Sequence, residues 1–143
     1  MAELVISRDI AAPQQQVWDV LVDWDVHDRW MLGTKATGGH GVGEPIRAFT
    51  GIGRVGFLDT MTITVWEPPR RAVVRHTGRV VRGSGAFEVQ ETGPGRSRIV
   101  WSEWIDLPFG ALGRLGWPVA KLGVRAGVLF SLGRLERYLH RAA

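Results

Sequence analysis

Residues 107–141 read LPFGALGRLGWPVAKLGVRAGVLFSLGRLERYLHR, and the fold of the whole chain depends on this stretch. Apolar residues recur three and four positions apart along it, which is the period of an amphipathic α-helix. No other stretch predicts a long helix, so the core is expected to form against this one. Pro118 predicts a break near Trp117, because proline removes a backbone donor and clashes with the preceding turn. We therefore expect a short helix over 110–116 and a main helix over 118–141.

Six glycines lie in or beside this helix, at positions 110, 113, 116, 123, 127 and 133. Each interior glycine costs a helix about 1 kcal/mol relative to alanine, so their presence needs a reason. Two reasons are open: close packing of the helix against a sheet, or room beneath it for a ligand. In the second case, leucine at Gly123 or Gly127 would fill the ligand cavity. Residues 107–116 would then be able to act as a gate, since their glycines permit backbone movement.

The composition limits the class of protein. A chain of 143 residues without cysteine predicts one domain over 1–143, with no disulfide framework and no thiol chemistry. The N-terminal residues lack the basic and apolar regions of a signal peptide. No stretch reaches 18 uncharged apolar residues, so no transmembrane span is expected. A cytoplasmic location follows as the expectation, for a monomer or a homodimer.

The net charge of +4 is concentrated on the terminal helix. The side of the helix opposite the apolar residues is expected to carry its basic residues, which are Arg114, Lys121, Arg125, Arg134, Arg137 and Arg141. Most such surfaces are simply solvated. Docking on an anionic membrane or on RNA is the alternative, and nucleic acid is the less favoured of these two partners.

The rest of the chain predicts mainly β-structure. Residues 3–10 alternate as a strand, and 13–22 and 24–31 carry apolar residues at helical spacing. Further strands are expected over 35–39, 45–50, 57–66, 71–77, 83–91 and 97–105, separated by turns rich in glycine and proline. This spacing predicts an antiparallel meander. The apolar face of such a sheet needs a cover, and only the terminal helix is long enough.

Several short motifs occur in a fixed order along the chain. They are Ile10-Ala11-Ala12-Pro13, Val17-Trp18, Leu21-Val22-Asp23, Trp30, Val65-Trp66-Glu67-Pro68-Pro69-Arg70, Gly95-Arg96-Ser97-Arg98-Ile99-Val100-Trp101 and Leu107-Pro108. In this order the chain resembles the START-like (SRPBCC) superfamily, in its branch of polyketide cyclases, dehydrases and lipid-transfer proteins. The resemblance covers essentially the whole chain.

The resemblance implies an α+β helix-grip fold. In that fold a curved seven-stranded antiparallel sheet wraps around a long C-terminal helix, and two short helices follow the first strand. An apolar cavity between sheet and helix would hold a lipid, sterol, polyketide or other hydrophobic molecule, without a cofactor. One fold hosts cyclases, carriers and sensors, so the resemblance does not choose among these activities.

Polar residues on otherwise apolar strand faces are the best candidates for chemistry. Because side chains alternate along a strand, the inward faces of 57–66, 71–77 and 97–105 each contain a polar exception: Asp59, His76 and Glu103. A buried polar group is costly unless it is paired, so these exceptions indicate a cavity that holds water or the polar end of a ligand. Alternatively, Asp59 and Glu103 reach solvent or pair with Arg47 or Arg75.

A polyketide cyclase or dehydratase would need a group that removes a proton and a donor that polarises a carbonyl. His76, Asp59 and Glu103 are the candidates for the first role, and Arg47 or Arg75 for the second. Whether the chain is an enzyme stays open on sequence alone.

Two other patterns are set aside. The spacing Gly51-x-Gly53-x-x-Gly56 matches a dinucleotide-binding fingerprint, but a strand follows it where the fingerprint requires a helix, so it predicts a hairpin turn. The histidines are scattered and there is no cysteine, so no metal site is expected.

The first hypothesis is a carrier or sensor that binds a hydrophobic small molecule. A cyclase or dehydratase is the alternative, and an interaction module that uses the basic side of the helix is the second alternative. The residues expected to line the cavity are Trp18, Trp30, Met61, Ile63, Phe87, Val89, Trp101, Val119, Leu122, Ala126 and Phe130.

Overall fold

A computed structural model of the chain describes residues 2–79, 81–106 and 110–142. Strand β1 (Ala2–Ile10) leads into α1 (Gln14–Leu21), the 3-10 helix η1 (Trp24–Val26) and α2 (His27–Trp30). The remaining elements are β2 (Thr34–Gly38), β3 (Pro45–Ile52), β4 (Val55–Glu67), β5 (Arg71–Thr77), β6 (Arg82–Gly93), β7 (Arg96–Ile105) and α3 (Gly110–Ala142). The predicted gate at 107–116 begins in residues 107–109, which lie outside the described residues.

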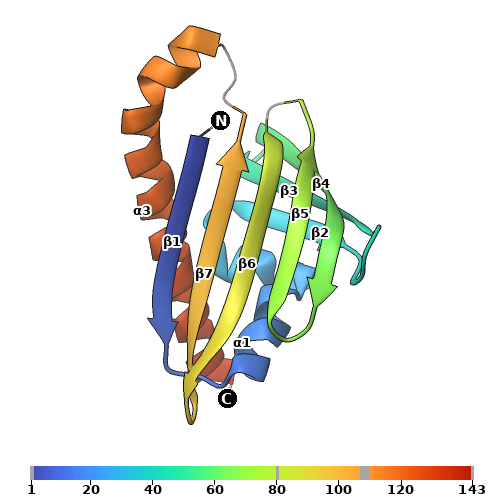
Figure 1. Ribbon diagram of the computed structural model, residues 1–143, viewed down its shortest axis with the longest axis vertical. Helices are drawn as coiled ribbons and strands as arrows, with labels where there is room; N and C mark the ends of the chain where they lie inside the picture. Colours follow the sequence, from blue (N-terminus) through green and yellow to red (C-terminus); the bar gives the residue numbers. More distant parts are fainter. Residues whose placement is uncertain (1, 80, 107–109, 143) are drawn as a thin grey trace.

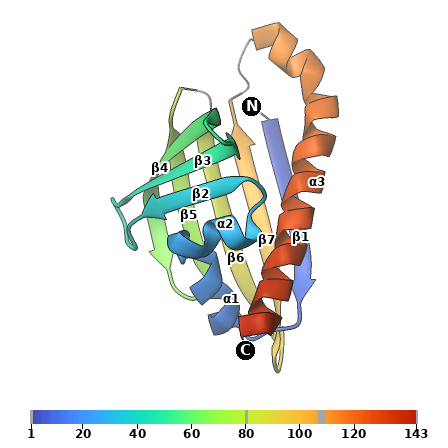
Figure 2. The same cartoon turned by 180° about the vertical axis from the view of Figure 1, so that it is seen from behind.

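The seven strands form one sheet in the order β1-β7-β6-β5-β4-β3-β2, and every neighbouring pair is antiparallel. The sheet curves, α1 and α2 lie against its concave face, and α3 runs along the β1 edge (Figures 1 and 2). This confirms the predicted α+β helix-grip architecture. The glycine-rich spacing at 51–56 forms the predicted hairpin, in which Gly51 pairs with Gly56.

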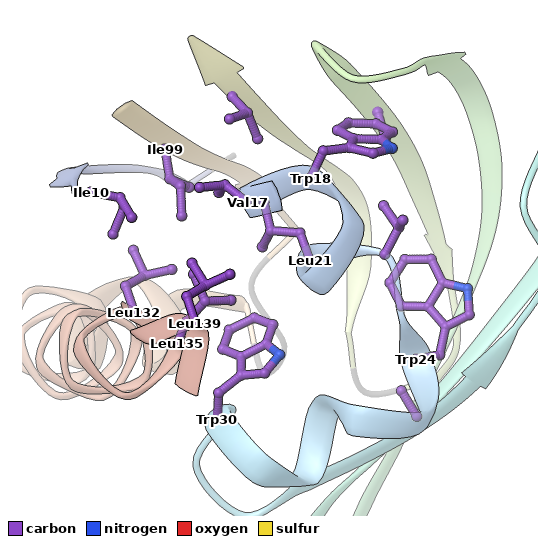
Figure 3. Close-up of a cluster of buried hydrophobic side chains, with 14 of the residues drawn as sticks. Ile10, Val17, Trp18, Leu21, Trp24, Trp30, Ile99, Leu132, Leu135 and Leu139 are labelled. Atoms are coloured by element: carbon purple, nitrogen blue, oxygen red, sulfur yellow. The ribbon is translucent and has the colours of Figure 1, made fainter. Parts of the chain in front are cut away.

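One end of the concave face is filled by a hydrophobic core. Leu132, Leu135 and Leu139 of α3 point toward α1 and toward Trp30 of α2 (Figure 3). Ile10 of β1 and Ile99 of β7 close this core from the sheet side. The C-terminal half of α3 is therefore anchored by burial of apolar side chains, which is the dominant favourable contribution to folding.

The N-terminal half of α3 is anchored less firmly, since its Trp117 packs against the core but is only half-buried. Leu112, Leu115, Val119 and Leu122 are 77, 78, 75 and 68% exposed. Together with Phe130, which is also exposed, these residues form what we call the apolar stripe. Most contacts of α3 with other described elements are to β1, α1 and α2, so the helix leaves most of the concave face uncovered (Figure 2).

Pro118 does not divide the terminal helix as predicted, because α3 is continuous from Gly110 to Ala142. Pro118 is exposed. The carbonyl oxygen of Arg114, which loses its backbone donor to the proline, can therefore be hydrated. Figure 1 shows α3 curving over its first turns, which is the response expected of a helix that contains proline. No helix in the described ranges is long and apolar enough to cross a membrane.

Candidate functional site

A cavity of about 310 Å³ lies between the concave face of the sheet, α2 and α3. This volume is at the lower end of the range, about 300–1,000 Å³, found for pockets that hold small molecules. Most of its wall is apolar. The lining residues are Leu4, Trp24, His27, Met31, Thr34, Ala36, Ile46, Ala48, Thr50, Phe57, Asp59, Met61, Val74, His76, Val81, Gly85, Ala86, Phe87, Trp101, Glu103, Ile105, Val124 and Val128.

Three polar residues on the sheet form a hydrogen-bonded group in the cavity wall, which we call the histidine cluster: Asp59 of β4, His76 of β5 and Glu103 of β7. The His76 Nδ1 atom lies 2.9 Å from Asp59 Oδ1, and His76 Nε2 lies 2.8 Å from Glu103 Oε2. Trp101 Nε1 donates a 3.1 Å hydrogen bond to Glu103 Oε1. Both ring nitrogens of His76 are thus engaged by carboxylates.

A glycine makes this arrangement possible. Glu103 and His76 lie on strands separated by β6, where Gly85 pairs with Glu103 in the register. A Cβ atom at position 85 would lie 2.7 Å from Glu103 Oε2 and 2.9 Å from Oε1. Only a residue without a side chain lets the Glu103 carboxylate cross β6 and reach the imidazole.

The surroundings of His76 change its protonation. Burial disfavours the charged imidazolium, but the hydrogen bonds that His76 donates to Asp59 and Glu103, together with the negative charges of these two groups, outweigh burial. The net result raises the pKa of His76 from 6.5 to about 10. At neutral pH the histidine cluster therefore consists of one imidazolium held between two carboxylates, and its formal charge is negative.

A second histidine in the wall behaves in the opposite way. His27 of α2 is packed between Trp24 and Trp30, with ring centroids 5.4 and 4.7 Å away. Burial lowers the pKa of His27 to about 4, although the backbone and charge of Asp23 and the charge of Asp28 act in the other direction. Its Nδ1 atom is buried and has no hydrogen-bond partner in the described part of the chain. His27 is therefore a neutral polar group in an apolar wall.

The strand residues predicted as catalytic candidates are brought together, since Asp59, His76 and Glu103 all face the cavity. Arg47 and Arg75 are exposed and alternate with inward-facing neighbours, so they point away from the cavity. The alternative pairing of the carboxylates with Arg47 or Arg75 is wrong. Both carboxylates bind His76 instead.

The predicted lining residues divide into three groups. Met61, Phe87 and Trp101 line the cavity. Four others, Trp18, Trp30, Ile63 and Val89, are buried in the hydrophobic core and do not line it. The remaining four are exposed on α3: Val119, Leu122, Ala126 and Phe130.

The prediction for α3 chose the wrong side of the helix. At about 100° per residue, Val119 and Leu135 lie about 160° apart around the helix axis, so one side cannot bury both. Val124 and Val128 line the cavity instead, and extending the Leu132–Leu135–Leu139 face backwards in steps of three and four would have found them. Close packing against the sheet does not explain Gly123 and Gly127, and room for a ligand beside them stays a prediction. A Cβ atom at Gly123 or Gly127 would meet no atom within 4 Å.

No set of three or more His, Cys, Asp and Glu side chains in the described residues is arranged to hold a metal ion. The histidine cluster itself is unsuited to this role, because each nitrogen of His76 already has a carboxylate partner.

Comparisons with known proteins identify a family and a shared fold. The family model described as "Polyketide cyclase / dehydrase and lipid transport" matches residues 1–140. A search of curated proteins found no match.

Solved structures show the same fold. Protein NE0264 from Nitrosomonas europaea is 16% identical with a TM-score of 0.79, covering 98% of this chain and 95% of its own. Protein TTHA0849 from Thermus thermophilus is 17% identical with a TM-score of 0.79, covering 99% of both chains. The Zhui aromatase/cyclase from Streptomyces sp. R1128 is 16% identical with a TM-score of 0.78, covering 98% of this chain and 94% of its own. At these identities the likeness concerns the fold alone.

Proposed function

The chain belongs to the polyketide cyclase/dehydrase and lipid transport family, and from this premise we propose that it binds a hydrophobic small molecule as a carrier or sensor. One observation carries the proposal: an apolar cavity of about 310 Å³ whose sheet side holds the charged histidine cluster and, apart from it, the hydrogen-bonded hydroxyls of Thr34 and Thr50. Apolar walls supply affinity and a few placed polar groups supply orientation. The proposal requires no cofactor.

The apolar wall is the source of affinity. Burial of apolar surface stabilises a complex by about 25 cal/mol per Å² before the costs of association are subtracted. Two of the aromatic lining side chains, Trp24 and Trp101, are tryptophans and offer flat surfaces for a ligand. They also provide a signal, because a ligand seated beside them changes their fluorescence.

Native mass spectrometry of the freshly purified protein, followed by solvent extraction, tests the proposal. We expect a discrete adduct of a few hundred daltons, with an extracted molecule that alters tryptophan fluorescence when it is added back. Ala48→Phe should abolish both signals, because Ala48 lines the cavity. Arg47→Ala is the matched control, since Arg47 is exposed. Equal binding by wild type and Ala48→Phe would contradict the proposal.

The histidine cluster also favours a second function, catalysis of cyclisation or dehydration. A carboxylate beside an imidazolium in an apolar cavity is a combination found in acid–base catalysis. The geometry supports binding better, because His76 has no free nitrogen to give to a substrate and Arg47 and Arg75 are outside the cavity. Asp59 is then the strongest candidate base. Normal turnover of a poly-β-ketone substrate by Asp59→Asn would contradict this function.

The apolar stripe of α3 favours a third function, docking on an anionic membrane. Its exposed leucines and Val119 lie on a helix that carries six basic residues and one acidic residue, Glu136. Glu136 is itself paired with Arg8 at 3.1 Å. Sedimentation with vesicles of anionic lipid tests this function. Salt-independent retention, or retention unchanged by Leu115→Ser, would count against it.

A further inference from the structure

The charges that face the cavity have an unusual distribution. Among its lining residues in the described part of the chain there is no lysine and no arginine. The ionisable lining residues are His27, Asp59, His76 and Glu103. His27 is a neutral side chain in this environment, so the only positive charge is the His76 imidazolium, which lies between two carboxylates. A ligand thus meets a wall whose formal charge is negative.

The hydrogen-bonding groups that the histidine cluster leaves to a ligand are acceptors. Elsewhere in the wall, the Thr34 hydroxyl bonds to Leu32 O and to the Thr50 hydroxyl, and neutral His27 carries one N–H. Both N–H groups of His76 point to Asp59 and Glu103, and the Trp101 N–H is donated to Glu103 Oε1. Asp59 Oδ2 has no hydrogen-bond partner among the described residues. The donors of the histidine cluster are therefore all used internally, while Asp59 keeps a carboxylate oxygen for another group.

The low polarity of the rest of the wall strengthens this preference. Electrostatic interactions are several times stronger in an apolar environment than in water. A carboxylate or phosphate that enters the cavity would lose its hydration and approach two carboxylates, with no free cation to receive it. A hydroxyl or ammonium group would instead donate a hydrogen bond to Asp59 Oδ2, which would then have a partner.

We propose that the cavity selects hydrophobic molecules whose polar end donates hydrogen bonds, as a hydroxyl or ammonium group does, and rejects molecules that end in a carboxylate or phosphate. This inference rests on the proposed function, because it specifies the class of molecule that the same cavity takes.

Three probes of equal chain length test it: decan-1-ol, decan-1-amine and decanoate. Each is titrated into the delipidated protein at pH 7 by isothermal calorimetry, with tryptophan fluorescence as a second readout. We expect the alcohol and the amine to bind at least about tenfold more tightly than decanoate, given the cost of burying a charge without a partner. Decanoate binding as tightly as decan-1-ol would overturn the inference and leave the proposed function standing. If none of the probes binds and no molecule co-purifies, the proposed function fails and the inference fails with it.

Variants of the histidine cluster separate the effect of charge on ligand preference from the effect of cavity shape. Asp59→Asn removes one negative charge without changing the size of the side chain, and it should reduce the preference for decanol over decanoate. Glu103→Gln should act in the same direction and serves as the second variant if the first does not fold. The matched control is Met61→Leu, which lies in the same wall and should change the affinities for both probes equally. An unchanged preference in folded Asp59→Asn and Glu103→Gln would overturn the inference.

Discussion

The two ends of the concave face are built from the same sheet but are covered differently. At one end, α1, α2 and the C-terminal half of α3 fill the space with Trp30, Leu132 and Leu135, all fully buried. At the other end none of the described elements fills it, and the histidine cluster lies in an open cavity. The difference shows how a small domain accommodates a costly polar group: the filled end supplies the stability that leaves the other end free to bind.

Leu135→Ala should have the largest effect on stability, because it leaves a void among fully buried side chains. We expect a loss of about 2–5 kcal/mol in the free energy of unfolding, measured by urea denaturation. Met61→Ala at the cavity should cost about 1 kcal/mol, since its side chain already borders empty space. Similar losses for both variants would erase the distinction between the two ends.

His76→Gln should change how stability depends on pH. The folded-state pKa of about 10 lies above the unfolded value of 6.5, so the contribution of His76 is complete below pH 6.5 and is lost as the pH rises toward 10. The free energy of unfolding of the wild-type protein, measured by chemical denaturation, should therefore fall as the pH rises from 6.5 toward 10. The same quantity should fall less for His76→Gln. If both proteins respond identically, the imidazolium does not hold the cluster together.

Gly85→Ala should have a smaller and more local effect. The new Cβ atom forces the Glu103 carboxylate away from His76, at a cost of about 1 kcal/mol for the lost hydrogen bond. The pKa of His76, followed by NMR titration of its ring protons, should fall toward its ordinary value. Gly93→Ala on the same strand is the control, because a Cβ atom there meets nothing within 4 Å. A His76 pKa unaffected by Gly85→Ala would show that Glu103 is not its partner.

Leu122→Ser should have the smallest effect, because Leu122 belongs to the exposed apolar stripe. We expect a change below about 0.5 kcal/mol in the free energy of unfolding, as for most surface substitutions. Leu132→Ser, ten residues further along the same helix, is the buried counterpart and should cost several times more. A large loss for Leu122→Ser would mean that the stripe is covered in solution.

Much of the fold could be predicted because it rests on local patterns. Strand alternation placed Asp59, His76 and Glu103 on the inner face, and turn residues located the strand boundaries to within a few positions. Alternation cannot show that the three side chains meet. Their contact depends on the registers of four strands and on the missing side chain of Gly85.

Two features were beyond a pattern-based prediction. Residue spacing does not distinguish the part of a sheet face that is filled by core side chains from the part that borders a cavity. It therefore predicts Trp18 and Val89 in the cavity wall, although both belong to the core. In α3, leucines three and four apart suggested one continuous apolar side. The helix instead carries two such sides, one toward the core near Leu135 and one toward solvent near Val119.

Because the two halves of α3 differ in how deeply they are buried, they should also differ in how fast they open locally. Over 110–126 Trp117 packs against the core, but no side chain of this segment is buried, and the segment contains Pro118. Its amide hydrogens are therefore held mainly by its own backbone bonds, and isolated helices of about 12–15 residues are marginal in water. Around Leu132 and Leu135, opening requires disruption of the core itself. Deuterium should therefore enter the first four turns of the helix long before it enters the last, and a protease that cleaves after arginine should cut at Arg114 while Arg137 is still protected.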